Sequence, residues 1–171
     1  MSVFSEYQTD TIDLALDFYG YEDCPKNYEF GPSVRDNFVL HFVTKGKGVF
    51  HFEKKEIHLE AGDLFLLPKN KVTYYQADAE EPWSYYWIGI SGTKVSDFMR
   101  FSTLHAKGYL KKTEVDTERI GLFMEQLVHK AEASKMTSHY QLHLLSQIYE
   151  LLFLISEVAP DIHRSHPSPT Y

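Results

Sequence analysis

Short runs of β-branched and aromatic residues, separated by turn-forming residues, fill the first half of this chain. Residues 37–44 (NFVLHFVT) and 49–52 (VFHF) flank a glycine-bearing turn, which predicts a β-hairpin. Further runs of this kind lie at residues 12–18, 57–59, 64–67, 72–76 and 84–90. Short strands at such regular spacing, about seven or eight in all, indicate a β-sandwich or β-barrel.

The spacing of apolar residues changes after residue 90 from about two to about 3.6, the period of an α-helix. This spacing predicts a helix over residues 91–104 and two longer helices over 116–133 and 137–158. The second half of the last helix is apolar nearly all round, so it needs cover on more than one side. The expected fold class is therefore α+β, mainly β, with a β-barrel followed by an antiparallel pair of α-helices.

The expected domain plan has three parts. Residues 1–90 form the barrel, residues 91–160 form a helical segment that ends at Pro160, and residues 161–171 begin an interdomain linker. The linker suggests that the natural chain continues beyond residue 171.

Charge and cysteine content limit the classes of function that this chain can have. The net charge of −7 comes without the stripe of Lys and Arg that a nucleic-acid site needs, so this stretch is not expected to contact DNA. A single cysteine, Cys24, allows no internal disulfide and fits a reducing compartment. No signal peptide precedes the strands and no run of about 18 apolar residues occurs, so a cytoplasmic protein without membrane contact is expected.

Three histidines, His41, His51 and His58, are the candidate metal ligands, because metal-binding β-barrels of the cupin type hold the metal with three His and one Glu. None of them forms a His-x-His pair, and no His follows the turn after Pro68. Nucleophile and phosphate-loop motifs are also missing. We therefore expect no metal, no cofactor and no catalysis. A metal-dependent cupin enzyme, such as a sugar isomerase or dioxygenase, is the alternative.

Three segments, YEFGPSVRDNFVLHFVTKGKGVF, LEAGDLFLLPKNKVTYYQAD and PWSYYWIGISG, resemble the N-terminal domain of AraC-family transcription regulators. The similarity is greatest to activators of raffinose and multiple-sugar operons in Gram-positive bacteria. It implies a cupin-like jelly-roll barrel that is metal-free and binds a small effector, a mono- or oligosaccharide. It also implies that the regulator is a homodimer and binds DNA only through a C-terminal helix-turn-helix domain, which is missing from these residues.

The resemblance also assigns residues to the effector pocket. Trp87 matches the ring-stacking tryptophan of the family, Tyr85 a polar residue on the same strand, and Tyr75 a pocket tyrosine, with Tyr74 as the alternative if the register differs. A sugar stacks its C–H face on such rings, while its hydroxyls need hydrogen-bond partners.

Arg35 matches the pocket arginine of the family, with a surface salt bridge as the alternative role. Residues 38, 40 and 42 or residues 39, 41 and 43 could face into the barrel, and in the second case His41 joins the pocket. Phe30 is expected to act as a lid.

The helices after the barrel form the dimer contact in this family. The predicted interface residues are Ile120, Met124, Leu127, Leu145, Ile148 and Leu152. The alternative is that these side chains only cover the barrel. A further possibility is a pure dimerisation module whose barrel is filled by its own side chains.

Overall fold

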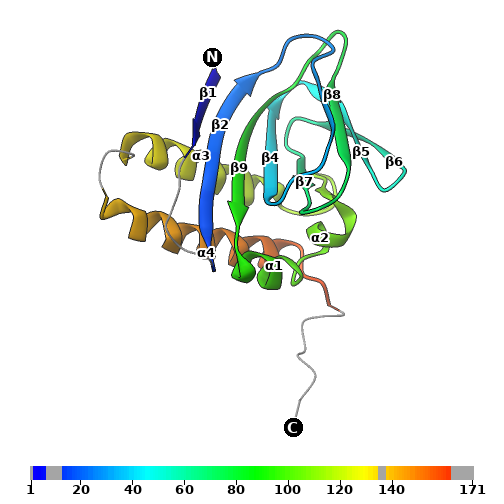
Figure 1. Cartoon of the computed structure of the whole chain (residues 1–171). Helices are drawn as coiled ribbons and strands as arrows, with labels where there is room; N and C mark the ends of the chain where they lie inside the picture. The colour runs from blue at the N-terminus through cyan, green and yellow to red at the C-terminus, as the bar shows by residue number, and fades with distance from the viewer. Residues whose placement is uncertain (1, 7–12, 135–137, 163–171) are drawn as a thin grey trace.

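The computed structural model describes residues 2–6, 13–134 and 138–162. In these residues two antiparallel β-sheets face each other, and helices pack against the outer face of the larger sheet (Figure 1). The six-stranded sheet contains, in spatial order, β1 (Ser2–Glu6), β2 (Ala15–Asp23), β9 (Ser84–Ser91), β4 (Phe38–Lys45), β7 (Leu64–Leu67) and β10 (Tyr109–Leu110). The four-stranded sheet contains β3 (Glu29–Ser33), β8 (Thr73–Ala77), β5 (Lys47–Phe52) and β6 (Lys55–Glu60).

The connections between the sheets confirm the predicted jelly roll. Without the edge strands β1 and β10, each sheet holds four strands, in the orders β2-β9-β4-β7 and β3-β8-β5-β6. The chain crosses from one sheet to the other after β2, β3, β4, β6, β7 and β8, as two interlocked Greek keys require. All the strand pairs that the structure describes are antiparallel.

Two of the sequence predictions for the β part were wrong. The strand expected over 12–18 begins at Ala15 and continues to Asp23, and residue 12 lies outside the described residues. For the stretch 20–33, the residues Pro25, Gly31 and Pro32 predict a loop rather than a strand, but it holds the end of β2 and all of β3. Pairing with β9 and β8 stabilises these segments in spite of their Gly and Pro residues.

Alternation along β4 assigns each face of the larger sheet. Val39, His41 and Val43 point between the sheets, whereas Phe38 and Leu40 point toward the helices. The open choice between the two faces of this strand is thereby settled, and His41 lies inside the barrel. The larger sheet is apolar on both faces because one face lines the barrel and the other is covered by helices.

The helical part contains α1 (Thr93–Met99), α2 (Thr103–Lys107), α3 (Thr117–Ser134) and α4 (Tyr140–Val158). The single helix predicted over 91–104 is divided, because Ser102 begins α2 by accepting a hydrogen bond from the Leu104 amide. The strand β10, which follows α2, pairs with β7, so the sheet gains a strand beyond residue 90.

The two long helices, α3 and α4, pack on the outer face of the larger sheet (Figure 1). Gly121 of α3 allows this close approach, since a Cβ atom at this position would lie 2.2 Å from the Phe42 ring. Sheet and helices share one apolar core, which includes Leu40 and Ile88 from the strands and Met124 and Ile148 from the helices.

The residues predicted to form a dimer interface lie mostly in this core. Ile120, Met124, Leu127 and Ile148 are fully buried within the single chain, Leu152 is buried and Leu145 is half-buried. The buried five cannot contact a partner, so their assignment to an interface was wrong and they cover the barrel instead. The large apolar side chains that α3 and α4 do expose are Leu122, Leu142, Tyr149 and Phe153.

Within the described residues, no helix has the length and apolar character needed to cross a membrane. Of the predicted linker at 161–171, residues 163–171 lie outside the described part of the chain.

Candidate ligand-binding site

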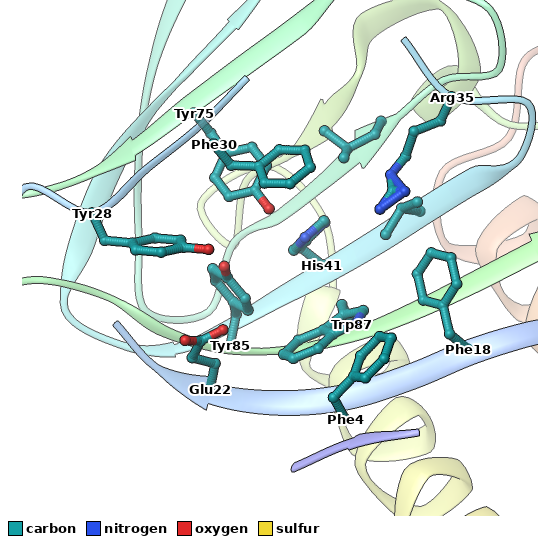
Figure 2. A pocket seen from close by; sticks show the side chains of 12 residues that line it. Phe4, Phe18, Glu22, Tyr28, Phe30, Arg35, His41, Tyr75, Tyr85 and Trp87 are labelled. Carbon is teal, nitrogen blue, oxygen red and sulfur yellow. The ribbon is translucent and has the colours of Figure 1, made fainter. Parts of the chain in front are cut away.

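A cavity of about 150 Å³ opens between the two sheets of the barrel (Figure 2). All six residues that the sequence analysis assigned to the pocket line it, namely Phe30, Arg35, His41, Tyr75, Tyr85 and Trp87. The alternative residue, Tyr74, does not line this cavity and donates a hydrogen bond to Glu29 at 2.6 Å. The structure therefore brings together the side chains that the resemblance singled out, although they come from β3, β4, β8, β9 and the loop before β4.

The indole ring of Trp87, on β9, packs over the backbone of the neighbouring strand β2. Gly20 of β2 is its register partner, and a Cβ atom at Gly20 would lie 2.3 Å from the indole ring. Phe4 of β1 pairs with Gly20 from the other side. Its ring stacks with the indole at a centroid distance of 6.1 Å and an interplanar angle of 25°. Glycine at position 20 is thus what allows the two rings to meet over β2 (Figure 2).

A cluster of rings forms the deep end of the cavity. His41 lies with its ring centroid 5.2 Å from that of Tyr75 and 4.9 Å from that of Tyr85. Burial raises the pKa of both tyrosines far above the usual range, so their phenols stay protonated at neutral pH. Each phenol can therefore donate a hydrogen bond to a ligand as well as accept one.

His41 is uncharged at neutral pH. Burial lowers the pKa of its imidazole to about 3, and the positive charge of Arg35 acts in the same direction. Its ring stacks on Phe65, with centroids 4.2 Å apart and planes at 7°. Its Nδ1 is buried and has no hydrogen-bond partner among the described residues.

Arg35 brings an unpaired positive charge to the cavity. Its guanidinium carbon lies 5.2 Å from the Phe18 ring centroid and 5.5 Å from that of Phe30, a cation–π arrangement. Within the described chain its side chain takes part in no hydrogen bond and no ion pair, and its Nε is buried. The alternative role as a surface salt bridge is therefore wrong, and the terminal N–H donors of the guanidinium are left for a ligand.

Sequence reasoning missed half of the lining. The lining residues not assigned to the pocket from the sequence are Phe4, Phe18, Glu22, Tyr28, Leu67 and Val39, the last of which lies on one of the two strand faces considered. Phe18, Gly20 and Glu22 alternate along β2, so extending the predicted strand beyond residue 18 would have found Glu22. Phe4 gave no such signal, because β1 was not predicted at all.

The three histidines considered as metal ligands do not converge. His41 lies inside the barrel, His51 packs beside Tyr74 at a centroid distance of 5.2 Å, and His58 is exposed next to Glu56. No group of three or more His, Cys, Asp or Glu side chains suited to a metal ion occurs in the part of the chain that the structure describes.

Comparison with known proteins gives a consistent picture. Residues 15–152 match the family model described as the AraC-like ligand binding domain. The Msm operon regulatory protein of Streptococcus mutans is 36% identical over 163 residues, which is 95% of this chain and 58% of that protein. The raffinose operon transcriptional regulatory protein of Pediococcus pentosaceus is 41% identical over 100 residues, 57% of this chain and 36% of that protein.

A third relative, the lactose operon transcription activator of Staphylococcus xylosus, is 27% identical over 94% of this chain and 57% of its own length. The chain thus spans less than two thirds of the curated relatives that it matches. Among solved structures, a cupin superfamily protein of Desulfitobacterium hafniense is 13% identical with a TM-score of 0.41, over 53% of this chain and 78% of that chain.

Proposed function

The chain belongs to the family of AraC-like ligand-binding domains, and on that basis we propose that its barrel binds a sugar effector of a transcription regulator. The regulator would control carbohydrate-utilisation genes, in keeping with the operon regulators to which the chain is similar. The effector would be a mono- or oligosaccharide, and the domain would act by binding it without catalysis.

The cavity itself carries this proposal. It combines an aromatic wall, formed by Trp87 and Phe4, with hydrogen-bonding groups from Arg35, Tyr75 and Tyr85. Sugars need this combination, because their C–H faces stack on rings while their desolvated hydroxyls need partners. A cavity of about 150 Å³ accommodates a single six-membered ring. We therefore expect one sugar residue to enter, with the remainder of an oligosaccharide outside.

The strand β1 links this cavity to the helices. Phe4 lies on Trp87, and the next residue, Ser5, donates a hydrogen bond of 2.9 Å to Glu132 of α3. An effector that contacts Trp87 would favour one position of β1 over others, and the contact with Glu132 would pass that preference to α3. The size of the response is limited by the difference in effector affinity between the two positions.

We also propose that the chain forms a dimer, but through residues other than those predicted from the sequence. Leu142, Tyr149 and Phe153 lie on one face of α4, and their side chains are exposed by 76%, 41% and 58%. Phe98 of α1 extends this apolar face beside Tyr149. We propose that this face meets a second copy of the chain, and that DNA is bound by a helix-turn-helix portion of a longer protein.

Thermal unfolding in the presence of sugars tests effector binding. Neutral hexoses, their methyl α-glycosides and α-galactosides are added to the chain at millimolar concentration. A ligand at about 100 times its Kd stabilises a protein by about 2.7 kcal/mol, which raises the Tm of a domain of this size by roughly 5–10 °C. Arg35→Met should abolish the shift, and Lys69→Met, an exposed position outside the cavity, should retain it. If none of these sugars changes the Tm, the proposed function is wrong.

Sedimentation equilibrium tests the dimer separately. The unsubstituted chain should associate at micromolar concentration, whereas a variant with Leu142→Ser and Phe153→Ser should sediment as a monomer. The Arg35→Met variant is the control and should associate like the unsubstituted chain. A monomer at every concentration would remove the proposed interface.

A further inference from the structure

Two opposite charges face each other across the cavity. Glu22 projects from β2 at one end, beside Tyr28 and Tyr85, and Arg35 projects from the loop before β4 at the other end (Figure 2). Both side chains are half-buried. Sequence reasoning did not single out Glu22, and the match to known proteins assigns it no role.

Neither charge is neutralised by any residue that the structure describes. The ion pairs and hydrogen bonds found among the described side chains include neither the Glu22 carboxylate nor the Arg35 guanidinium. Partly desolvated charges without partners cost free energy, and a ligand that supplies hydrogen bonds to them recovers it. The two groups therefore determine which ligand groups bind favourably at each end of the cavity.

The fields of both groups reach the rest of the lining. Burial raises the pKa of Tyr28, and the negative charge of Glu22 raises it further. At the other end, the charge of Arg35 contributes to the low pKa of His41. A charged ligand would thus meet a favourable field at one end of the cavity and an unfavourable field at the other.

Among neutral, acidic and amino sugars, only the neutral ring, with hydroxyls at both ends, satisfies both groups. A hydroxyl donates to the carboxylate of Glu22 and accepts from the guanidinium of Arg35. A sugar acid would pair with Arg35 but would place its negative charge in the same small cavity as Glu22. An amino sugar would pair with Glu22 and meet the same difficulty at Arg35. Like charges held close together oppose binding strongly.

We infer that Glu22 and Arg35 together act as a charge filter, which admits neutral polyhydroxylated rings, and that Glu22 is the residue that rejects acidic sugars. The inference rests on the proposed function, because it requires that a sugar enters this cavity.

Isothermal titration of the whole 171-residue chain tests it. The probes are D-galactose and D-glucose, each with its uronic acid and its 2-amino-2-deoxy derivative. The neutral member should bind at least about tenfold more tightly than either charged member. In Glu22→Gln, the preference for neutral over acidic sugar should fall by about tenfold, because the repelling charge is gone while a hydrogen-bonding amide remains.

Glu80→Gln is the matched control, since it removes the same charge from an exposed residue outside the cavity. It should leave the preference unchanged. Acidic sugars that bind the unsubstituted chain as tightly as neutral ones, or an unchanged preference in Glu22→Gln, would overturn the charge filter and leave the proposed function intact. The absence of binding by every neutral probe would overturn both.

Discussion

Mild acid should destabilise this protein through one buried histidine. His41 is only 2% exposed, and its pKa is about 3 in the folded chain, compared with 6.5 for an unperturbed histidine. Between these two values the unfolded chain holds one proton more than the folded chain, so the free energy of unfolding falls as the pH falls. The slope is about 1.4 kcal/mol per pH unit, which amounts to roughly 2 kcal/mol between pH 6.5 and about pH 5. Above pH 6.5 the contribution vanishes.

Urea unfolding at several pH values, from about 7.5 down to about 5, measures this loss. His41→Phe, which keeps a ring to stack on Phe65, and His41→Gln remove the titration. Carboxylates contribute to acid sensitivity in all three proteins, so the quantity of interest is the difference between the original protein and each variant. That difference should change by about 2 kcal/mol in favour of the variants over this range. If the free energy of unfolding changed with pH by the same amount in the original protein and in the variants, the argument that His41 is buried in its neutral form would be refuted.

Three further changes test the packing of the site and the helices. Gly20→Ala would place a methyl group against Trp87, and we expect effector affinity by calorimetry to fall at least about tenfold; an unchanged affinity would contradict the role of this glycine. Phe4→Ala removes a ring stacked on Trp87 and should weaken effector binding roughly two- to tenfold in the same assay, while full affinity would show that Phe4 is not part of the site. Ile148→Ala should lower the free energy of unfolding by about 2–5 kcal/mol, whereas Leu122→Ala, at an exposed position outside the proposed interface, should change it by no more than about 0.5 kcal/mol; equal effects would contradict the burial pattern.

The sequence was sufficient to predict a β-barrel followed by helices, but the faces of the central strands could not be read from it. A strand with one solvent-exposed face alternates between apolar and polar residues. In β4 both faces are buried, so Phe38 and Leu40 look no different from Val39 and Val43. Only the packing of helices on one side and of the second sheet on the other decides that His41 points into the barrel.

The missed parts of the site have a related cause. Phe4 enters the cavity only because β1 pairs with β2, and no local sequence pattern predicts this pairing. Glu22 was missed because Pro25, Gly31 and Pro32 indicated a loop over residues 20–33, although pairing with β9 keeps β2 extended to Asp23. The dimer prediction was wrong for a different reason. Helical periodicity identifies an apolar face but does not say whether a sheet or a partner covers it.

The placement of the cavity limits how an effector could act on the helices. The strands that carry Trp87 and His41 also carry Ile88 and Leu40 into the core beneath α3 and α4, so they are held on both faces. Close-packed cores resist small displacements. The strand β1 is different, since it pairs on one side only and Phe4 is 58% exposed. It nevertheless contacts both the cavity, through Phe4, and α3, through Ser5 and Glu132. We therefore expect effector binding to change β1 before any other element of the barrel.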